Sequence, residues 1–333
     1  MLDTARPTNQ TDFSKLVEPH RHELQVHCYR MLGSLQDAED LVQETLLRAW
    51  QKLDTYAGRA SFRAWLYKIA TNACLDTLDR RPRRTLPPAY QVAADPNERP
   101  AAPITEPIWL EPIPDDLLAD IDASPEARYD TRESITLAFL AAMQSLPPRQ
   151  RAVLILRDVL DWHAEQVAQL LDLTVSAVNS ALHRARVTLA KLYHTQGFDA
   201  MQTPPSDDVT RTLLDQYVSA WENADIDALV ALLKEDAILS MPPSPSWYQG
   251  RDSIRAFVVT IVPRGVATGH WRFVPTRANG QPAFAWYQRD EHRMYRAFAI
   301  MVVESQNALV SASHVFMNPA LFTFFKMPLE FKA

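Results

Sequence analysis

The chain has 333 residues, including 24 prolines, 7 glycines and 2 cysteines, and its formal charge at pH 7 is −6. This length suggests two or three domains, and the 47% hydrophobic and 22% charged residues are typical of an ordinary soluble globular protein. Collagen-like, disulfide-rich and wholly disordered classes are therefore excluded. The negative charge also argues against a nucleic-acid-binding protein, provided that the charge is spread evenly along the chain.

Neither the amino terminus nor any apolar run predicts export or a membrane span. Residues 1–12 are polar, unlike a signal peptide, and the longest apolar runs, 137–143 and 297–303, are far shorter than the roughly 20 residues that a span requires. Cys28 and Cys74 each lie in an apolar helical pattern, which predicts buried free thiols. We expect a cytoplasmic protein with no metal site and no cofactor.

Proline and acidic residues divide the chain unevenly. Ten of the 24 prolines fall between Pro82 and Pro125, and residues 91–134 hold 11 acidic residues against three arginines. Missing helix donors and like-charge repulsion predict an extended, mostly non-regular linker over 86–133. A second boundary is expected at 197–208, where Thr-Pro-Pro-Ser-Asp-Asp follows a long helical pattern. The expected folded parts are therefore 10–85, 134–195 and 207–333.

Two apolar stripes predict a helical bundle in the first part. They comprise Ala38, Leu41, Val42, Thr45, Leu46, Ala49 and Trp50, and then Phe62, Trp65, Leu66, Ile69, Ala70 and Ala73. The face opposite the first stripe carries Asp40, Gln43, Glu44 and Arg48. Aromatic and basic residues flank the second helix: Tyr56, Arg59, Ser61, Arg63, Tyr67, Arg80, Arg81, Arg83 and Arg84. Such a mixture suits single-stranded nucleic acid, and a solvated arginine-rich helix end is the alternative.

The second part has helix-turn-helix spacing. A short apolar face at Ala164–Leu171 is followed by a turn at 172–174 and a longer stripe that begins at Val175. Asp172 stands where the turn usually prefers glycine, but aspartate tolerates left-handed geometry, and the Thr174 hydroxyl can cap the second helix. The exposed side of that helix offers Ser176, Asn179, Ser180, His183, Arg184 and Arg186, which suit base edges and phosphates. An ordinary helical hairpin is the alternative.

These segments together resemble one bacterial family. Asp37–Thr45 and Tyr56–Ala70, with Asn72, Asp76 and Arg80-Arg81, look like region 2 of extracytoplasmic-function (ECF) RNA polymerase sigma factors. Leu146–Leu154 and Val178–Arg186 look like their region 4. The resemblance covers about 130 residues, and it implies a transcription initiation factor that binds RNA polymerase core and promoter DNA.

The resemblance also assigns roles to individual positions. Polymerase binding, at the β′ clamp with the β subunit as a further partner, is implied for Asp40, Gln43 and Glu44. Recognition of the −10 element and strand opening are implied for Tyr56, Ser61, Phe62, Trp65, Asn72, Arg80 and Arg81, because an extruded base needs stacking and polar contacts. Major-groove reading of the −35 element is implied for the Ser176–Arg186 face, although Arg186 could instead contact only phosphate or a helix neighbour.

The linker has its own resemblance. Ile108-Trp-Leu-Glu-Pro is similar to a Trp-Leu-Pro-Glu-Pro-like motif in ECF factors that carry fused carboxy-terminal domains. Trp109 and Leu110 are therefore candidate regulatory residues. A simple apolar staple to a neighbouring domain is the alternative, and the two readings are compatible.

Residues 207–333 resemble a SnoaL-like domain, the cone-shaped α+β barrel shared with nuclear transport factor 2. Helical stripes at 213–221 and 226–233 precede four strand-like runs at 269–277, 282–288, 294–303 and 309–316. The expected fold class is thus two all-α sigma domains followed by this barrel. Fusion to a complete sigma factor favours control in cis.

Such barrels often enclose a small-molecule pocket. Its candidate lining residues are Trp221, Trp247, Tyr248, His270 and His314. No carboxylate or histidine pair with catalytic spacing is identifiable, so we expect no catalytic residue and no enzyme activity. The alternative function is a SnoaL-like isomerase or cyclase tethered to a DNA-binding module.

Overall fold

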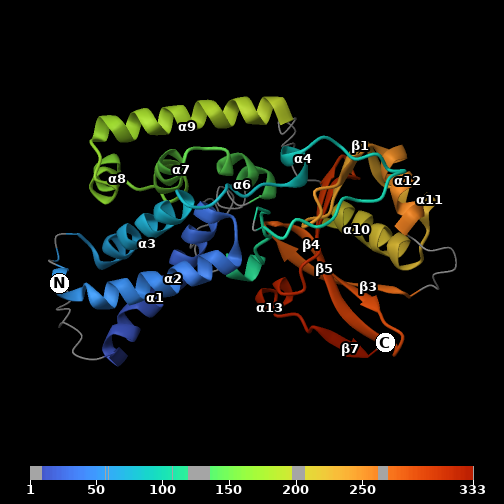
Figure 1. Cartoon of the computed structure of the whole chain (residues 1–333), viewed down its shortest axis with the longest axis horizontal. Helices are drawn as coiled ribbons and strands as arrows, with labels where there is room; N and C mark the ends of the chain where they lie inside the picture. The colour runs from blue at the N-terminus through green and yellow to red at the C-terminus, as the bar shows by residue number, and fades with distance from the viewer. Residues whose placement is uncertain are drawn as a thin grey trace. The chain divides into compact units, whose positions relative to one another are not determined.

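The computed structural model describes residues 10–56, 58, 60–106, 108–118, 136–196, 207–261 and 269–332. The chain forms two compact units, one of residues 1–83 with 116–195 and one of residues 84–115 with 196–333 (Figure 1). Among the described residues, no helix combines the length and the apolar composition needed to cross a lipid bilayer.

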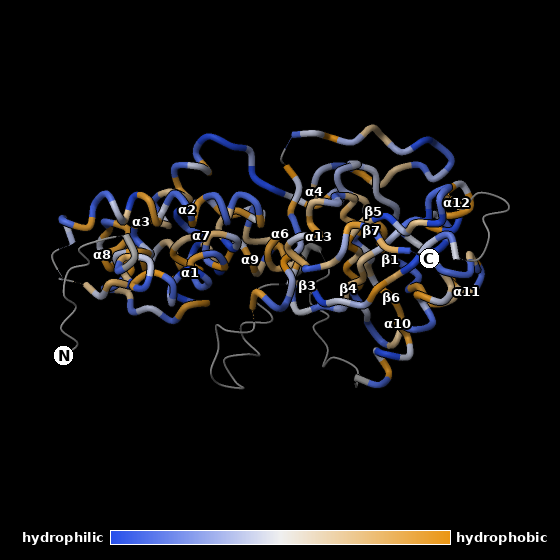
Figure 2. Tube along the Cα trace, turned by 90° about the horizontal axis from the view of Figure 1, so that it is seen from below, coloured by the Kyte–Doolittle hydropathy of each residue, from blue (hydrophilic) through white to orange (hydrophobic). Residues whose placement is uncertain are grey.

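The first half of the amino-terminal unit is a bundle of α1 (Gln10–Leu32), α2 (Leu35–Gln51) and α3 (Phe62–Leu78). Side-chain caps start two of these helices: Ser34 accepts from the amide of Asp37, and Ser61 from the amide of Ala64. The residues of the predicted stripes are buried or half-buried except Trp50, which is 38% exposed. Apolar positions alternate with polar ones along each helix (Figure 2). Both cysteines are free and buried, as predicted.

The described second half of this unit contains four short helical segments and one long helix. They are α6 (Leu137–Gln144), α7 (Pro148–Leu154), the π-helical turn η3 (Ile155–Val159), α8 (Ala164–Leu171) and α9 (Val175–Gln196). Asp172 adopts the predicted left-handed conformation, with φ of 55°. The Thr174 hydroxyl accepts from the amide of Ala177 at 3.1 Å, which confirms the predicted cap. The helix-turn-helix is therefore present.

A buried arginine ties the two halves of the unit together. Arg151 donates to the carbonyl of Met31 on α1 and to the side chain of Gln144 on α6, each at 2.5 Å. Its guanidinium also donates to the carbonyls of Met143, Gln144 and Leu146. Burial lowers the pKa of Arg151 to about 10, so the side chain stays charged at neutral pH. Loss of this residue would leave several buried carbonyls without donors.

The carboxy-terminal unit is built on a mixed sheet. Its strands are β1 (Leu233–Ser240), β2 (Trp247–Gln249), β3 (Trp271–Ala278), β4 (Gln281–Arg289), β5 (Met294–Gln306), β6 (Leu309–Phe316) and β7 (Glu330–Lys332). The order is β2-β1-β6-β5-β4-β3, with β7 on β5, and only the β1–β6 pair is parallel. Because β2 and β3 do not pair with each other, the described sheet is open, and the closed-barrel description is not confirmed.

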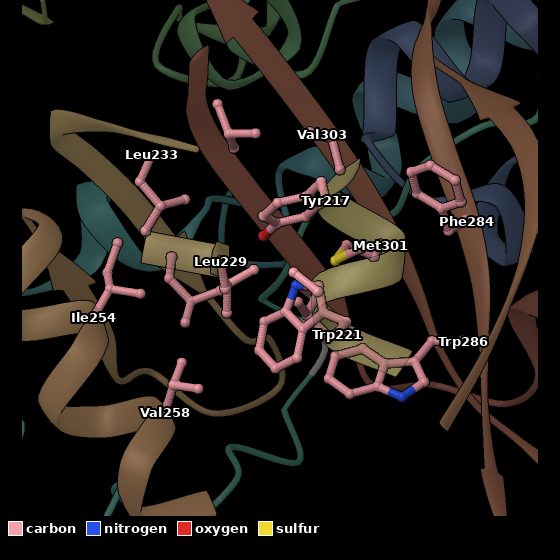
Figure 3. Close-up of a cluster of buried hydrophobic side chains, with 14 of the residues drawn as sticks. Tyr217, Trp221, Leu229, Leu233, Ile254, Val258, Phe284, Trp286, Met301 and Val303 are labelled. Atoms are coloured by element: carbon pink, nitrogen blue, oxygen red, sulfur yellow. The ribbon is translucent and has the colours of Figure 1, made fainter. Parts of the chain in front are cut away.

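Helices α10 (Asp207–Glu222), α11 (Ile226–Ala231) and α12 (Arg251–Ile261) pack on this sheet, and the short helix α13 (Leu321–Phe324) lies against β5. Tyr217 and Trp221 of α10 lie among strand residues such as Trp286 and Met301 (Figure 3). All four predicted strand runs are confirmed. The predicted helical stripe at 226–233 is too long, because α11 ends at Ala231 and β1 begins at Leu233.

The described part of the acidic segment is mostly non-regular, as predicted, apart from the short helices α4 (Pro87–Tyr90) and η2 (Asp115–Leu117). Its residues up to Asp115 nevertheless pack within the carboxy-terminal unit, and the teal trace runs out along that unit and back (Figure 1). Backbone hydrogen bonds join Ala94 to Trp247 at 2.8 Å and Ile104 to Pro243 at 2.9 Å. Residues 119–135, which carry the rest of the predicted linker, lie outside the described part.

Candidate nucleic-acid and polymerase interfaces

The polymerase-binding candidates lie together on the solvent face of α2. Asp40, Gln43 and Glu44 are all exposed, and Glu44 pairs with Arg48 at 2.6 Å. Leu47 continues this face with 56% of its surface exposed. Sequence reasoning missed Leu47, although an apolar residue one turn beyond an acidic-amide face is the signal that could have found it. The arrangement offers an apolar contact within a polar rim, as many protein interfaces do.

The predicted −10 residues form an aromatic cluster at the start of α3. Tyr56, Phe62 and Trp65 have ring centroids 5.2–5.6 Å apart, and all three are half-buried. The Tyr56 hydroxyl donates to the carbonyl of Ala60 at 2.8 Å, which holds the ring beside the helix start. Exposed ring faces beside the capping Ser61 can stack with an unpaired base.

The remaining −10 candidates lie along and beyond α3, and only some are available for DNA. Asn72 and Arg80 are exposed. Arg81 pairs with Asp37 of α2 at 2.7 Å. This ion pair within the helical bundle competes with any contact from Arg81 to DNA. Arg59 is outside the described residues. The neighbouring arginines of this basic cluster therefore differ in the structure: Arg80 is exposed, whereas Arg81 is paired with an aspartate.

The −35 candidates form one continuous exposed surface on α9. Ser176, Asn179, Ser180, His183, Arg184 and Arg186 are all exposed. Buried residues on the opposite side of the helix, including Val178, Leu182 and Ala185, hold it against the unit. Arg186 makes a bidentate pair with Asp158 at 2.7 and 2.9 Å, which realises the helix-neighbour alternative for this residue. Arg184 makes no comparable ion pair within the part of the chain that the structure describes.

The helix-turn-helix packs on α3 within the amino-terminal unit. Lys68 of α3 pairs with Asp172 at 2.7 Å. The ring of Trp162 lies 5.1 Å from that of Tyr67, and the Arg63 guanidinium lies 5.6 Å from the Trp162 ring centroid. Arg63 also pairs with Glu23 at 2.7 Å. Charged and aromatic side chains near the proposed −10 surface are therefore engaged by the domain proposed to read the −35 element.

The linker motif is buried in the carboxy-terminal unit. Leu110 is fully buried and Trp109 is only 6% exposed. The amide of Leu110 donates to the carbonyl of Thr85 at 2.9 Å, and Arg84 donates to the carbonyl of Trp109 at 2.8 Å. Further along, Ile113 exchanges hydrogen bonds with Asn279 in the β3–β4 turn. These contacts agree with the alternative in which the motif attaches the linker to the neighbouring domain.

The five pocket candidates do not converge on one cavity in the described residues. Trp221 and Tyr248 fill the core (Figure 3 shows Trp221), whereas the Trp247 indole donates to the carbonyl of Gln91 in the linker. His270 bonds Gln288 at 3.0 Å, and burial with the charge of Arg289 lowers its pKa. His314 is buried against the Ser240 hydroxyl at 2.7 Å, and this burial lowers its pKa.

A pocket of about 340 Å³ lies elsewhere in this unit, where the linker motif meets the ends of β1 and β6. Its walls include Trp109 and Leu110 from the motif and Pro243, Phe316 and Leu321 from the domain. Sequence reasoning missed this pocket, because its two walls are more than 120 residues apart in the chain.

Comparisons with known families match three segments of the chain. Residues 16–84 match Sigma-70 region 2, residues 136–189 match Sigma-70 region 4, and residues 214–312 match a SnoaL-like domain. Fold, helix-turn-helix and family matches together define a sigma-70-type transcription initiation factor with a fused SnoaL-like domain. Such factors are not enzymes.

Individual relatives agree with this class. The chain is 44% identical to the ECF RNA polymerase sigma factor SigG of Mycobacterium tuberculosis over 95% of this chain and 84% of that protein. It is 27% identical to SigW of Bacillus subtilis over 55% of this chain and 89% of that one. The crystal structure of Mycobacterium tuberculosis SigJ shares the fold, with a TM-score of 0.56 and 21% identity over 95% of this chain and 99% of that chain. The chain belongs to the ECF RNA polymerase sigma factors.

Proposed function

We propose that this sigma factor docks on the β′ clamp of core polymerase through the solvent face of α2. The support is the cluster of Asp40, Gln43 and Glu44 around the exposed Leu47. Acidic side chains at the rim guide association with a basic partner surface, and the leucine supplies apolar area that only binding buries. The factor would act in the cytoplasm, where core polymerase is found.

The −35 element is read by the exposed face of α9. The single observation that carries this proposal is that all six side chains predicted for it lie exposed on one helix of a helix-turn-helix. Asn179 and Ser180 offer donors and acceptors for base edges, and Arg184 offers a cation for phosphate or guanine. Binding of a promoter duplex by polymerase holoenzyme, compared between Asn179→Ala and the wild type, tests this role. The proposal requires a loss at one −35 position rather than at all sequences.

The −10 element is opened and held by the cluster of Tyr56, Phe62 and Trp65. Their rings provide the stacking surface that an unpaired base needs, and Ser61 and Asn72 provide nearby polar groups. Trp65→Ala is expected to slow open-complex formation more than it weakens initial promoter binding. Permanganate reactivity of unpaired thymines separates the two steps.

The packing of region 4 on region 2 is a resting arrangement that opens when polymerase binds. The support is that Lys68 and Arg63, both on α3, contact Asp172 and Trp162 instead of solvent. Exposed pairs of this kind are worth at most about 1 kcal/mol each, whereas the buried hydrogen bonds of Arg151 to α1 cost more to break, so the binding free energy of core polymerase would have to drive the opening.

The carboxy-terminal unit controls the factor in cis by holding the linker. The support is the buried Leu110 and the hydrogen bonds that join residues 84–115 to the SnoaL-like domain. A truncation after region 4 would remove Asn279, the hydrogen-bond partner of Ile113, and the rest of the domain at once, so a point substitution in the full chain is the cleaner test. Leu110→Glu places a charge in an apolar site and is expected to release the linker.

The matched control for this test is Val92→Glu, which adds the same charge at a linker position that is 85% exposed. Core-polymerase affinity and promoter-specific transcription are measured for both variants. A change in either quantity for Leu110→Glu alone supports control in cis. Equal behaviour of the two variants and the wild type contradicts it.

A further inference from the structure

A row of polar side chains joins α1 to α3 and ends at the aromatic cluster. His20, Glu23 and His27 follow one another at helical spacings of three and four, so they lie on one face of α1. His27 is fully buried, and its Nε2 atom lies 2.9 Å from the Thr71 hydroxyl of α3. At the other end of the row, the His20 ring lies 6.1 Å from the ring of Phe62. His20 therefore extends the aromatic cluster onto α1.

Glu23 fixes the orientation of the His20 ring. Its Oε1 atom lies 2.7 Å from Nδ1 of His20, while its Oε2 atom accepts from Arg63 Nε at 2.7 Å and from the Tyr67 hydroxyl at 3.3 Å. An ionised carboxylate can only accept hydrogen bonds, so Nδ1 carries the proton. In a neutral imidazole the other nitrogen, Nε2, is then an acceptor.

The Nε2 atom is the part of the His20 ring that remains for DNA. The side chain is 24% exposed, and within the described residues its ring makes only the hydrogen bond to Glu23. A base that stacks on the neighbouring aromatic rings presents its polar edge to side chains beside them. An acceptor at this place suits the exocyclic amino group of adenine, cytosine or guanine, and thymine has no such group.

We propose that His20 is a specificity-determining residue of the −10 interface, whose Nε2 atom accepts a hydrogen bond from the exocyclic amino group of the captured base. Glu23 is the positioning residue that holds the ring for this contact. The inference rests on the proposed capture of a −10 base by the aromatic cluster, and it adds the chemical group that is read. Stacking alone accepts every base, because every base has a π-face, whereas this hydrogen bond disfavours thymine at one position.

Selection from single-stranded oligonucleotides tests the proposal. The strands are randomised over the −10 element and are bound at pH 8 by polymerase holoenzyme that contains the full-length chain. We expect the wild type to prefer an amino-bearing base at the captured position. His20→Phe keeps a ring beside Phe62 but removes both nitrogens, and should reduce this preference about two- to tenfold at that position alone. The matched control, His22→Phe, lies about 200° further round α1 and should keep the wild-type preference.

Base analogues identify the group that is read. In the preferred strand, replacing adenine by purine, cytosine by pyrimidin-2-one or guanine by hypoxanthine removes only the exocyclic amino group. One such replacement should weaken binding of the wild type about two- to tenfold and leave binding of His20→Phe unchanged. The proposal is overturned if no analogue separates the two proteins, or if His20→Phe relaxes a preference for thymine.

Variants of Glu23 test its positioning role. Glu23→Ala releases the ring and should reduce the same base preference as His20→Phe. Glu23→Gln keeps an acceptor for the Nδ1 proton and should retain part of the preference. Equal weakening on every strand, with the base preference intact in Glu23→Ala, would overturn the positioning role.

Trp65→Ala separates this inference from the proposed capture of a base. It removes stacking surface, so it should weaken binding to all strands. If Trp65→Ala weakens binding and His20→Phe changes no base preference, only the reading by His20 is wrong. If Trp65→Ala binds every strand as the wild type does, the proposed capture itself is wrong.

Discussion

Lys68 Nζ lies 2.7 Å from Asp172 Oδ1, and this ion pair joins α3 of region 2 to the turn of the region 4 helix-turn-helix. Nζ also donates to the carbonyl of Gln169 at 3.3 Å, near the end of α8. Asp172 has φ of 55°, where glycine would be less strained. An aspartate at this position thus contributes a contact between the two regions that glycine could not make.

Asp172→Asn is expected to raise the affinity for core polymerase by up to about fivefold. The reason is that the exposed ion pair contributes at most about 1 kcal/mol to the resting arrangement, in which region 4 packs on region 2. Asparagine keeps the tolerance for left-handed backbone but loses the charge. Lys68→Met should act similarly, and the double variant should gain little more than either single variant. Affinities measured by fluorescence anisotropy would contradict the resting arrangement if both variants weakened binding additively.

Leu47→Ala is expected to lower core-polymerase affinity by at least about fivefold while leaving the unfolding midpoint unchanged. Leu47 is mostly exposed in the free chain, so its truncation removes little from the core but removes apolar area from the interface. Val92→Ala, at another exposed apolar position, is the matched control. Unchanged affinity for Leu47→Ala would remove the α2 face from the proposed docking surface.

Arg184→Ala is expected to weaken promoter binding and to reduce the slope of log affinity against log salt by about 1, if the side chain contacts phosphate. The control is Arg211→Ala on α10, outside the DNA-reading surface. Salt titrations of holoenzyme on promoter duplex measure both quantities. A variant with wild-type affinity and slope would show that Arg184 does not face DNA.

His27 gives the amino-terminal unit a defined pH dependence. Burial and the nearby charges of Arg30 and Arg63 lower its pKa from 6.5 to about 3, so the unfolded chain binds the proton more readily. Its contribution to stability is complete above about pH 6.5 and is lost as the pH falls toward 3. Between pH 7 and pH 5 this amounts to about 2 kcal/mol.

The variant His27→Gln should therefore lose less stability over this range than the wild type. Urea unfolding, followed by helical circular dichroism at pH 7 and pH 5, gives the two free energies of unfolding. Identical pH dependence in both proteins would show that folding does not lower the pKa of His27.

The sequence was most informative where function depends on local pattern. The exposed face of α9, the Thr174 cap and the left-handed Asp172 all follow from spacing within a few turns of helix. The four longer strands were also predictable, because alternation and strand length are local properties. The stripe through Leu233 was misleading because helix and strand patterns overlap where α11 runs into β1.

Contacts between residues far apart in the chain could not be predicted from local sequence patterns. The acidic composition of residues 91–134 predicts an extended segment, yet its docking depends on partners such as Pro243 and Asn279 far along the chain. Likewise, the sequence does not show that Arg186 is paired with Asp158 or that Arg81 is paired with Asp37. The five pocket candidates are all aromatic residues of one domain. The fold nevertheless places them in different environments rather than around one cavity.

Every role proposed for this chain requires it to bind core polymerase as the promoter-recognition subunit. The most direct test of this binding is size-exclusion chromatography of the full-length protein with purified core polymerase at low salt. We expect a one-to-one complex that retains the chain, and we expect Leu47→Ala to weaken this complex. Separate elution of the chain and the core enzyme at every concentration tested would contradict it.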